Sequence, residues 1–190
     1  MTNNTIQIVS IVLAIVVLLI ILIVGFGTTL LREVNDKTKP YSFSRFQLFL
    51  WTLAIAPVFA IHWGFRYFPG TDKQMINPTA LILLGISSAV TLTASVVGSV
   101  QVASKLRNKG THTLKLERKT EGWWIDILTD DQGQFSVARL QQLVFTLIYI
   151  VVYLSTFFGA EMKLPEFDNY AFVLMGISTG SYVVGKSMYK

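Results

Sequence analysis

The stretch Tyr41-Ser-Phe-Ser-Arg-Phe-Gln-Leu-Phe-Leu-Trp-Thr-Leu53 decides the fold, because the chain repeats it as Phe135-Ser-Val-Ala-Arg-Leu-Gln-Gln-Leu-Val-Phe-Thr-Leu147. A serine, an arginine, a glutamine, a threonine and the final leucine coincide in the two stretches. A Gly-Ile-Ser block follows each of them, at residues 85–87 and 176–178. An internal repeat has to be recognised first, since overlooking it leads to the wrong fold. Each unit has a long apolar segment, a loop and a second long apolar segment, so the sequence predicts a duplicated transmembrane hairpin.

The distribution of charge places these segments in a membrane. Of the 190 residues, 52% are hydrophobic and only 14% are charged, whereas soluble domains average about 25% charged residues. The charged residues are also segregated, and five long stretches contain none. A bilayer core of about 30 Å requires about 20 apolar residues in a helix. We therefore predict five transmembrane helices, at about residues 6–30, 46–66, 78–103, 140–158 and 169–186.

The predicted fold class is an all-α membrane protein, in which two parallel-repeat hairpins form a four-helix bundle and an N-terminal helix adds an anchor. The first apolar run is expected to remain as this anchor, because no basic residue precedes it and no small-residue cleavage site follows it. The predicted divisions are the anchor at 1–31, the first hairpin at 41–104, a cytoplasmic connecting segment at 105–134 and the second hairpin at 135–190.

The basic residues predict the orientation. Thirteen of the 16 Lys and Arg residues fall in loop 31–45, in loop 104–139 or in the C-terminal tail. Short loops rich in Lys and Arg stay in the cytoplasm. The chain is therefore expected in the inner membrane of a bacterial cell, with its N-terminus outside and its C-terminus in the cytoplasm. Both hairpins then start from the cytoplasm, so an axis along the membrane normal should relate them.

Polar residues within the predicted spans are candidates for lining a pore. Gln47 and Gln141 occupy equivalent places, and an amide in the bilayer is costly unless protein or water pairs with it. Serine and threonine recur every four residues in the third span, which places them on one helix face. Helix packing also explains this stripe, so both interpretations stay open. The pore-lining candidates are Gln47, Gln141, Ser87, Thr91 and Ser178.

Small residues in the same spans predict close helix contacts. Gly85-x-x-x-Ala89 and Gly176-x-x-x-Gly180 have the spacing that lets membrane helices approach each other closely. The stretch from Gly180 to Ser187 also matches the phosphate-binding pattern G-x-x-x-x-G-K-[ST]. That motif must follow a strand and open a helix, whereas an apolar helix precedes it here. We therefore expect no nucleotide binding.

The helix starts and the connecting segment are predicted to meet the membrane surface or a partner. Arg45 and Arg139 lie one turn after Ser42 and Ser136, at the start of their spans, where a long basic side chain can extend to the headgroups. A salt bridge to a nearby aspartate is the alternative for Arg139. The aspartates of the connecting segment do not have the spacing of a calcium loop. The interfacial anchors are Arg45, Arg139, Trp123 and Trp124, and the partner-docking candidates are Asp126, Asp130 and Asp131.

Catalysis finds no support in the sequence. Apart from Arg66 and Lys186 at the last positions of their spans, His62 is the only Asp, Glu, Lys, Arg or His within the predicted spans, and its place beside Trp63 near the outer interface favours an interfacial histidine. No catalytic motif is present, and the chain has no cysteine. We therefore expect neither an enzyme nor a metal or cofactor site.

The order of the motifs resembles a family of uncharacterised bacterial multi-pass membrane proteins. Its carriers are Ser-x-x-Arg-x-Gln before a threonine, then Gly-Ile-Ser, then Trp-x-Asp-Ile-Leu ahead of the second copy. The resemblance spans about residues 41–186 and implies no activity.

Two classes of function fit these features. The first is a homo-oligomeric channel or pore lined by the polar candidates. The alternative is a non-conducting scaffold or sensor that docks a soluble cytoplasmic partner through loop 104–139. The spans contain no carboxylate, which disfavours a proton-coupled pump. The expected partners are the lipid bilayer, further copies of the chain and, for the second class, a soluble protein; nucleic acid is not expected.

Overall fold

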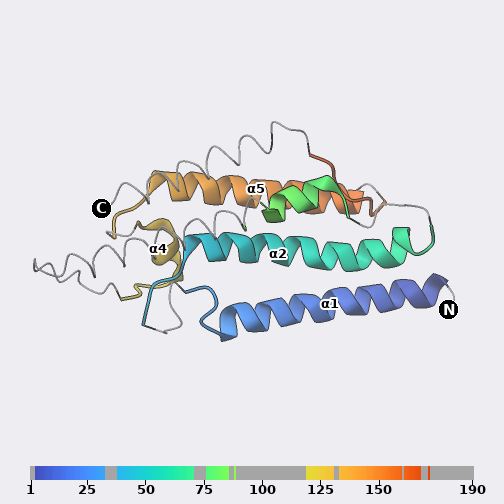
Figure 1. Ribbon diagram of the computed structural model, residues 1–190, viewed down its shortest axis with the longest axis horizontal. Helices are drawn as coiled ribbons and strands as arrows, with labels where there is room; N and C mark the ends of the chain where they lie inside the picture. The colour runs from blue at the N-terminus through green and yellow to red at the C-terminus, as the bar shows by residue number, and fades with distance from the viewer. Residues whose placement is uncertain are drawn as a thin grey trace, which may run out of the picture.

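The computed structural model describes residues 3–32, 38–70, 76–85, 88, 119–130, 133–159, 161–167 and 171. All regular structure in these residues is helical (Figure 1). Their β pairing consists of isolated antiparallel bridges, one between Arg32 and Tyr41 and one between Thr129 and Phe135. The prediction of an all-helical protein is therefore confirmed for the described part of the chain.

Three of the described helices are long and apolar enough to cross a membrane. They are α1 (Asn3–Gly27), α2 (Phe43–His62) with the π-helix η1 (Trp63–Tyr67) that continues it, and α5 (Val137–Gly159). The other two predicted spans fall largely outside the described residues, although residues 78–85 form a helix. Membrane insertion thus has the support of three candidate spans, and the total of five stays a prediction.

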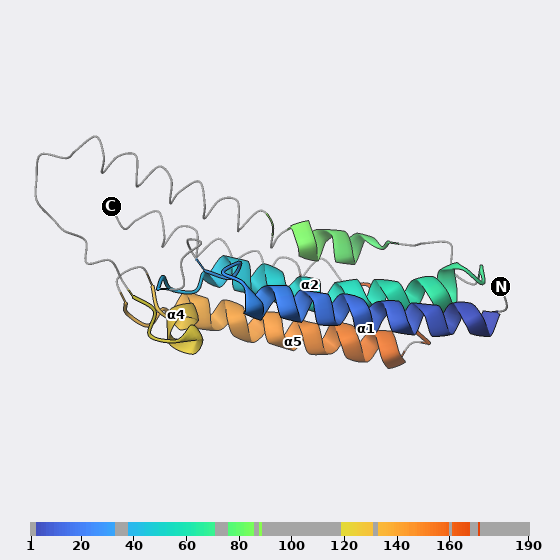
Figure 2. The same cartoon turned by 90° about the horizontal axis from the view of Figure 1, so that it is seen from below.

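The three long helices lie lengthwise beside one another, with α2 between α1 and α5 (Figures 1 and 2). α1 ends where α2 begins, so these two are antiparallel. α2 and α5 both begin near the short helix α4 (Trp123–Leu128) and therefore run in the same direction, as parallel hairpins require. We call this the α4 end of the bundle, and the opposite end, where α2 passes into η1, the His62 end.

Helix α1 has one packed face, although its sequence is apolar all round. A Cβ atom on Gly64 of η1 would lie only 2.3 Å from Cβ of Ser10, and one on Gly25 would lie 2.2 Å from the ring of Phe49. Glycine at these two points lets the helices approach closely. Other apolar side chains of α1 are exposed, as suits contact with lipid. The helix predicted as an anchor therefore also packs against α2 and η1.

Two apolar clusters hold the bundle together. The first lies near the α4 end, where Phe43, Phe46 and Phe49 of α2 pack with Leu31 and Ile127. The second cluster contains Trp51, Ile55, Val58, Ala80, Leu83, Tyr153, Phe157 and Leu164. Because the clusters draw on segments far apart in the sequence, they fix α2 against α5 and against the loops at both ends.

Candidate functional site

The two arginines at the helix starts hold matching positions. Nη1 of Arg45 donates a hydrogen bond to the carbonyl oxygen of Arg32 at 2.7 Å, and Nη1 of Arg139 donates to that of Thr129. Arg32 and Thr129 are the residues that form the β-bridges with Tyr41 and Phe135. Each arginine therefore ties the first turn of its helix to the segment that precedes it.

The serines that precede α2 and α5 match in the same way. The backbone N–H of Ser42 donates to the carbonyl oxygen of Leu31 at 2.7 Å, and that of Ser136 donates to that of Leu128 at 2.9 Å. The backbone thus turns into both helices through the same pair of contacts, a bridge and a serine hydrogen bond. Their side chains differ, because Oγ of Ser136 accepts a hydrogen bond from the backbone N–H of Arg139 at 3.4 Å, whereas Ser42 makes no side-chain cap hydrogen bond.

Arg139 was predicted to extend to the lipid headgroups, but the structure buries it in the protein. Its side chain is only 6% exposed and is held by protein. Arg45 is less buried and donates to carbonyl oxygens as well, to Arg32 and, at 3.3 Å, to Leu30. The basic residues at this depth therefore order the helix starts, and only Arg45 combines that role with access to the surroundings.

Asp126 is the centre of the α4 end. Its Oδ2 accepts hydrogen bonds from the Thr120 hydroxyl at 2.6 Å and from the backbone N–H of Tyr41 at 3.2 Å. Its Oδ1 accepts from the backbone N–H of Glu121 at 3.2 Å. The carboxylate is buried and joins the segments that precede α2 and α4. Asp126 was predicted to dock a partner. Its buried carboxylate instead holds the segments before α2 and α4 together.

Asp130 shapes the turn before α5. Its Oδ1 accepts from the backbone N–H of Gln134 at 3.0 Å, and its own N–H donates to the Gln134 carbonyl oxygen at 2.7 Å. Gly133 completes this turn with a φ of 84°, which glycine adopts without strain. Asp130 is partly exposed and also serves the turn, while Asp131 lies outside the described residues.

A buried amide network joins α2 to α5. Nε2 of Gln142 donates to Oε1 of Gln47 at 2.8 Å, and Nε2 of Gln47 donates to Oγ1 of Thr146 at 3.1 Å. All three side chains are at most 5% exposed. The amide of Gln47 is therefore paired at both its oxygen and its nitrogen within a single chain.

The glutamine of α5 that pairs with Gln47 is not the one that the repeat alignment equated with it. It equated Gln47 with Gln141, but Gln141 is exposed and its neighbour Gln142 faces α2. Helical spacing carried the missing signal, because Gln142 and Thr146 are four residues apart and share a face with Arg139. Of the other pore-lining candidates, Ser87, Thr91 and Ser178 lie outside the described residues.

Of the four small residues predicted to make close helix contacts, the structure describes only Gly85. Gly85 is exposed, and a Cβ added there meets none of the described atoms within 4 Å, so its role as a packing position stays a prediction. Ala89, Gly176 and Gly180 lie outside the described residues. The observed close contacts use Gly25 and Gly64, which the sequence analysis did not single out.

The α4 end also carries a group of exposed apolar side chains. Trp123 and Trp124 stack with ring centroids 3.9 Å apart, and Trp123 also contacts the ring of Phe46 at 5.8 Å. Trp124 is 56% exposed, Phe135 75% and Val137 78%. We define the exposed apolar group as Trp123, Trp124, Ile125, Phe135 and Val137.

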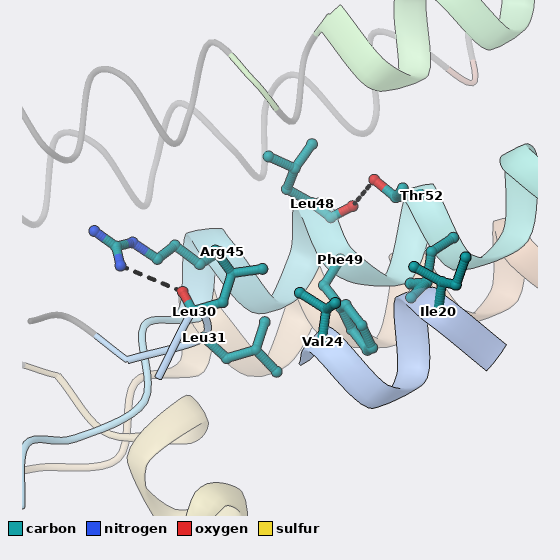
Figure 3. Close-up of a pocket in the computed structure, with 9 residues that line it drawn as sticks. Ile20, Val24, Leu30, Leu31, Arg45, Leu48, Phe49 and Thr52 are labelled. Atoms are coloured by element: carbon teal, nitrogen blue, oxygen red, sulfur yellow. Dashed lines mark hydrogen bonds between the residues drawn. The ribbon is translucent and has the colours of Figure 1, made fainter. Parts of the chain in front are cut away.

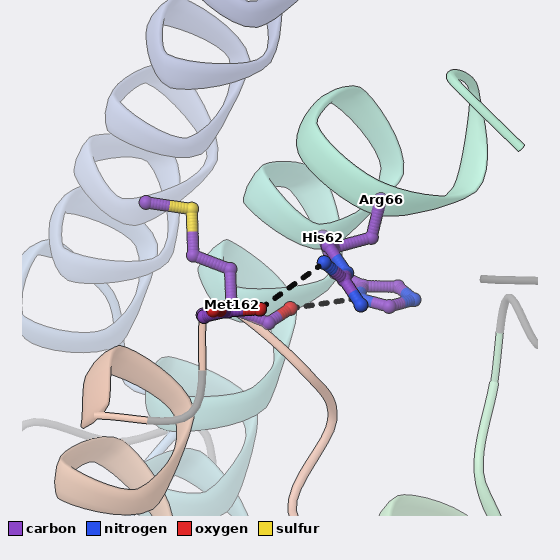
Figure 4. A network of polar contacts seen from close by, with 4 residues as sticks. His62, Arg66 and Met162 are labelled. Carbon is purple, nitrogen blue, oxygen red and sulfur yellow. Dashed lines mark hydrogen bonds and ion pairs between the residues drawn. The ribbon is translucent and has the colours of Figure 1, made fainter. Parts of the chain in front are cut away.

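The His62 end is closed by polar contacts to the loop after α5. Nδ1 of the fully buried His62 lies 3.0 Å from the carbonyl oxygen of Met162, and Nη1 of Arg66 lies 3.8 Å from a Glu161 carboxylate oxygen (Figure 4). His62 was expected to be interfacial, but it joins two segments inside the protein.

Asn77 makes a second polar joint at the His62 end, and the sequence analysis missed it. Its Nδ2 donates to the carbonyl oxygen of Pro165 at 2.6 Å, while its Oδ1 accepts from the backbone N–H of Ala80 at 3.1 Å. The signal was an asparagine followed by Pro78, the usual beginning of a helix. The loop after α5 is therefore tied to two helices.

The described residues include no group of three His, Cys, Asp or Glu side chains placed to hold a metal ion. Comparison with known proteins gives no match to a family model, to a curated protein or to a solved structure. The resemblance to uncharacterised multi-pass membrane proteins therefore stays a prediction, and the proposal for function rests on the geometry alone.

Proposed function

We propose that this chain is a non-conducting integral membrane protein that presents a fixed docking surface to a soluble partner. The observation that carries the proposal is the pairing of the Gln47 amide with Gln142 and Thr146 inside one chain. The channel hypothesis relied on an amide that needed pore water as a hydrogen-bond partner. Since protein atoms already pair with both ends of the Gln47 amide, that reason for a conduit is removed.

The docking surface is the α4 end with its exposed apolar group. Exposed apolar patches mark sites of interaction, and tryptophan is enriched among the residues that contribute most to binding. Asp126 and Arg139 join the surrounding segments by hydrogen bonds. These bonds hold in place the segments that carry the exposed rings. A partner that binds a preorganised surface loses less free energy to ordering.

Orientation and membrane type belong to the same proposal. Among the described residues, Arg32, Lys39, Arg45, Lys119 and Arg139 lie at the α4 end, whereas Arg66 and Lys163 lie at the His62 end. We place this end in the cytoplasm of a bacterial cell by the positive-inside rule. The duplicated hairpin is also proposed here, with the matching bridges and arginine contacts at the two helix starts as its support.

Conductance measured on the purified full chain in planar bilayers tests the first half of the proposal. We expect no unitary currents from the wild type and none from Gln47→Glu. In a channel, a ring of carboxylates would make the pore cation-selective. Wild-type currents that Gln47→Leu abolishes would overturn the proposal and restore the pore.

Site-specific photo-crosslinking in cells tests the second half. A benzophenone amino acid in place of Trp124 is expected to capture a soluble protein. The same residue in place of Phe158, which is 60% exposed near the end of α5, is the matched control and should not. Capture of lipid alone at Trp124 would assign the tryptophans to the membrane interface and refute the docking surface.

A further inference from the structure

A groove of ≈ 410 Å³ lies between α1 and α2 near the α4 end (Figure 3). Among the described residues that line it, the walls are aliphatic and aromatic apart from Thr52 and Arg45, and none of these residues is acidic. The Thr52 hydroxyl donates to the carbonyl oxygen of Leu48 at 2.8 Å, so it presents no unsatisfied donor to the groove. The lining residues are Ile20, Ile21, Val24, Leu30, Leu31, Arg45, Leu48, Phe49 and Thr52.

The groove runs from the start of α2 into the membrane-spanning part. Arg45 and Thr52 are seven positions apart, which corresponds to about 10 Å at 1.5 Å per residue. The guanidinium lies at one end, beyond Leu30, and Ile20 lies at the other (Figure 3). The polar end of the groove is therefore at the depth of lipid headgroups and its apolar length is at the depth of acyl chains.

Arg45 is suited to hold an anion at that end. Its hydrogen bonds to the described residues both come from Nη1, whereas a guanidinium has five N–H donors. Its fork matches two oxygens of a phosphate. Arg32 adds positive charge beside it, but its own guanidinium is engaged by Tyr41, at 3.2 Å from the hydroxyl and 4.3 Å from the ring centroid.

We propose that this groove binds an anionic phospholipid, with one acyl chain along α1 and α2 and the phosphate at Arg45. Charge complementarity favours this occupant, because an anionic headgroup supplies a counter-charge to the guanidinium at the mouth of the groove and a purely apolar partner does not. Basic pockets between membrane helices bind lipid headgroups in this way. The proposal does not depend on whether the chain docks a soluble partner.

Native mass spectrometry of the detergent-purified full chain tests it, with phosphatidylglycerol and phosphatidylcholine of identical acyl chains as probes. We expect one tightly held phosphatidylglycerol, favoured over phosphatidylcholine by about fivefold, the effect of one basic side chain near an anionic headgroup. Arg45→Gln should abolish the preference, and Arg45→Lys should retain most of it.

A second pair of variants keeps the test decisive if Arg45→Gln fails to fold. Ile20→Trp places a large ring over the groove from an exposed position and should reduce retention of both lipids. Ile23→Trp is the control, because Ile23 is exposed on the same helix but does not line the groove. Equal retention of the two lipids by the wild type, undiminished binding in Ile20→Trp, or a dimer that Ile20→Trp dissociates would each overturn the proposal.

Discussion

Single buried polar residues determine how the ends and the middle of this bundle are joined. Asp126 accepts hydrogen bonds from the Thr120 hydroxyl and from the backbone N–H groups of Tyr41 and Glu121. It therefore joins the segment before α2 to the segment before α4. A buried donor that loses its acceptor retains the full cost of leaving water. The function of such a residue is therefore positional, although its charge first suggested a contact for a partner.

Replacing Asp126 with alanine should lower the free energy of unfolding by about 3 kcal/mol, because it strands donors that now bind a charged acceptor. Thermal unfolding in detergent, followed by circular dichroism, measures the effect. Asp130→Ala is the control, with an expected loss of about 1 kcal/mol, since Asp130 is partly exposed. Equal losses of unfolding free energy in the two variants would show that the buried contacts of Asp126 do not stabilise the α4 end more than the exposed turn of Asp130 does.

Gln142 and Gln141 offer a direct comparison of a buried and an exposed amide. Gln142→Leu leaves Oε1 of Gln47 without its donor and should cost about 1 kcal/mol, a typical magnitude for hydrogen bonds between membrane helices. Gln141→Leu should change stability by less than about 0.5 kcal/mol. The double variant Gln47→Leu/Gln142→Leu should recover part of the loss, because both partners are then apolar. Additive losses in unfolding titrations would contradict the network.

At the scale of elements, the sequence predicted which segments are helical better than which faces meet. The apolar stretches located α1, α2 and α5, because length and hydropathy alone define a span. The packing face of α1 was not recognised, since contact there depends on small residues such as Ser10 and Gly25 rather than on any contrast in polarity. The same limit led to Gln141 in place of Gln142, because repeat alignment ignores the rotation of a helix about its axis.

The contact between Gly64 and Ser10 makes the joint of α1 and α2 testable. Gly64→Ala adds a Cβ that would lie 2.3 Å from Cβ and Oγ of Ser10, so the helices must separate at an expected cost of about 1–3 kcal/mol. Ser10→Gly in the same chain removes those atoms and should restore most of the stability. Gly27→Ala is the control, because an added Cβ there meets nothing within 4 Å. A Gly64→Ala variant as stable as the wild type would mean that α1 is not held at this point.

At the scale of the whole molecule, the polar contacts of the described residues gather at the two ends and at one buried joint between α2 and α5. The sequence indicated the parallel direction of these two helices through the shared side of their basic loops. It did not indicate the contacts of His62 and Asn77, which bring together residues about 90 to 100 positions apart. Such pairs follow from tertiary packing, which no local pattern encodes. Hydrogen bonds join both ends to the bundle, so we expect a partner or lipid at the α4 end to meet a preformed surface.

The orientation of the molecule gives the last prediction, and the absence of cysteine makes it easy to test. Gln134→Cys and Glu166→Cys place single thiols at exposed positions before and after α5 without changing the count of basic residues. Because the basic loops hold the α4 end in the cytoplasm, a membrane-impermeant maleimide should label Glu166→Cys in intact cells and Gln134→Cys only after permeabilisation. The reverse pattern would place the α4 end outside and remove the cytoplasmic partner from the proposal. Labelling of both thiols in intact cells would show that α5 does not cross the membrane.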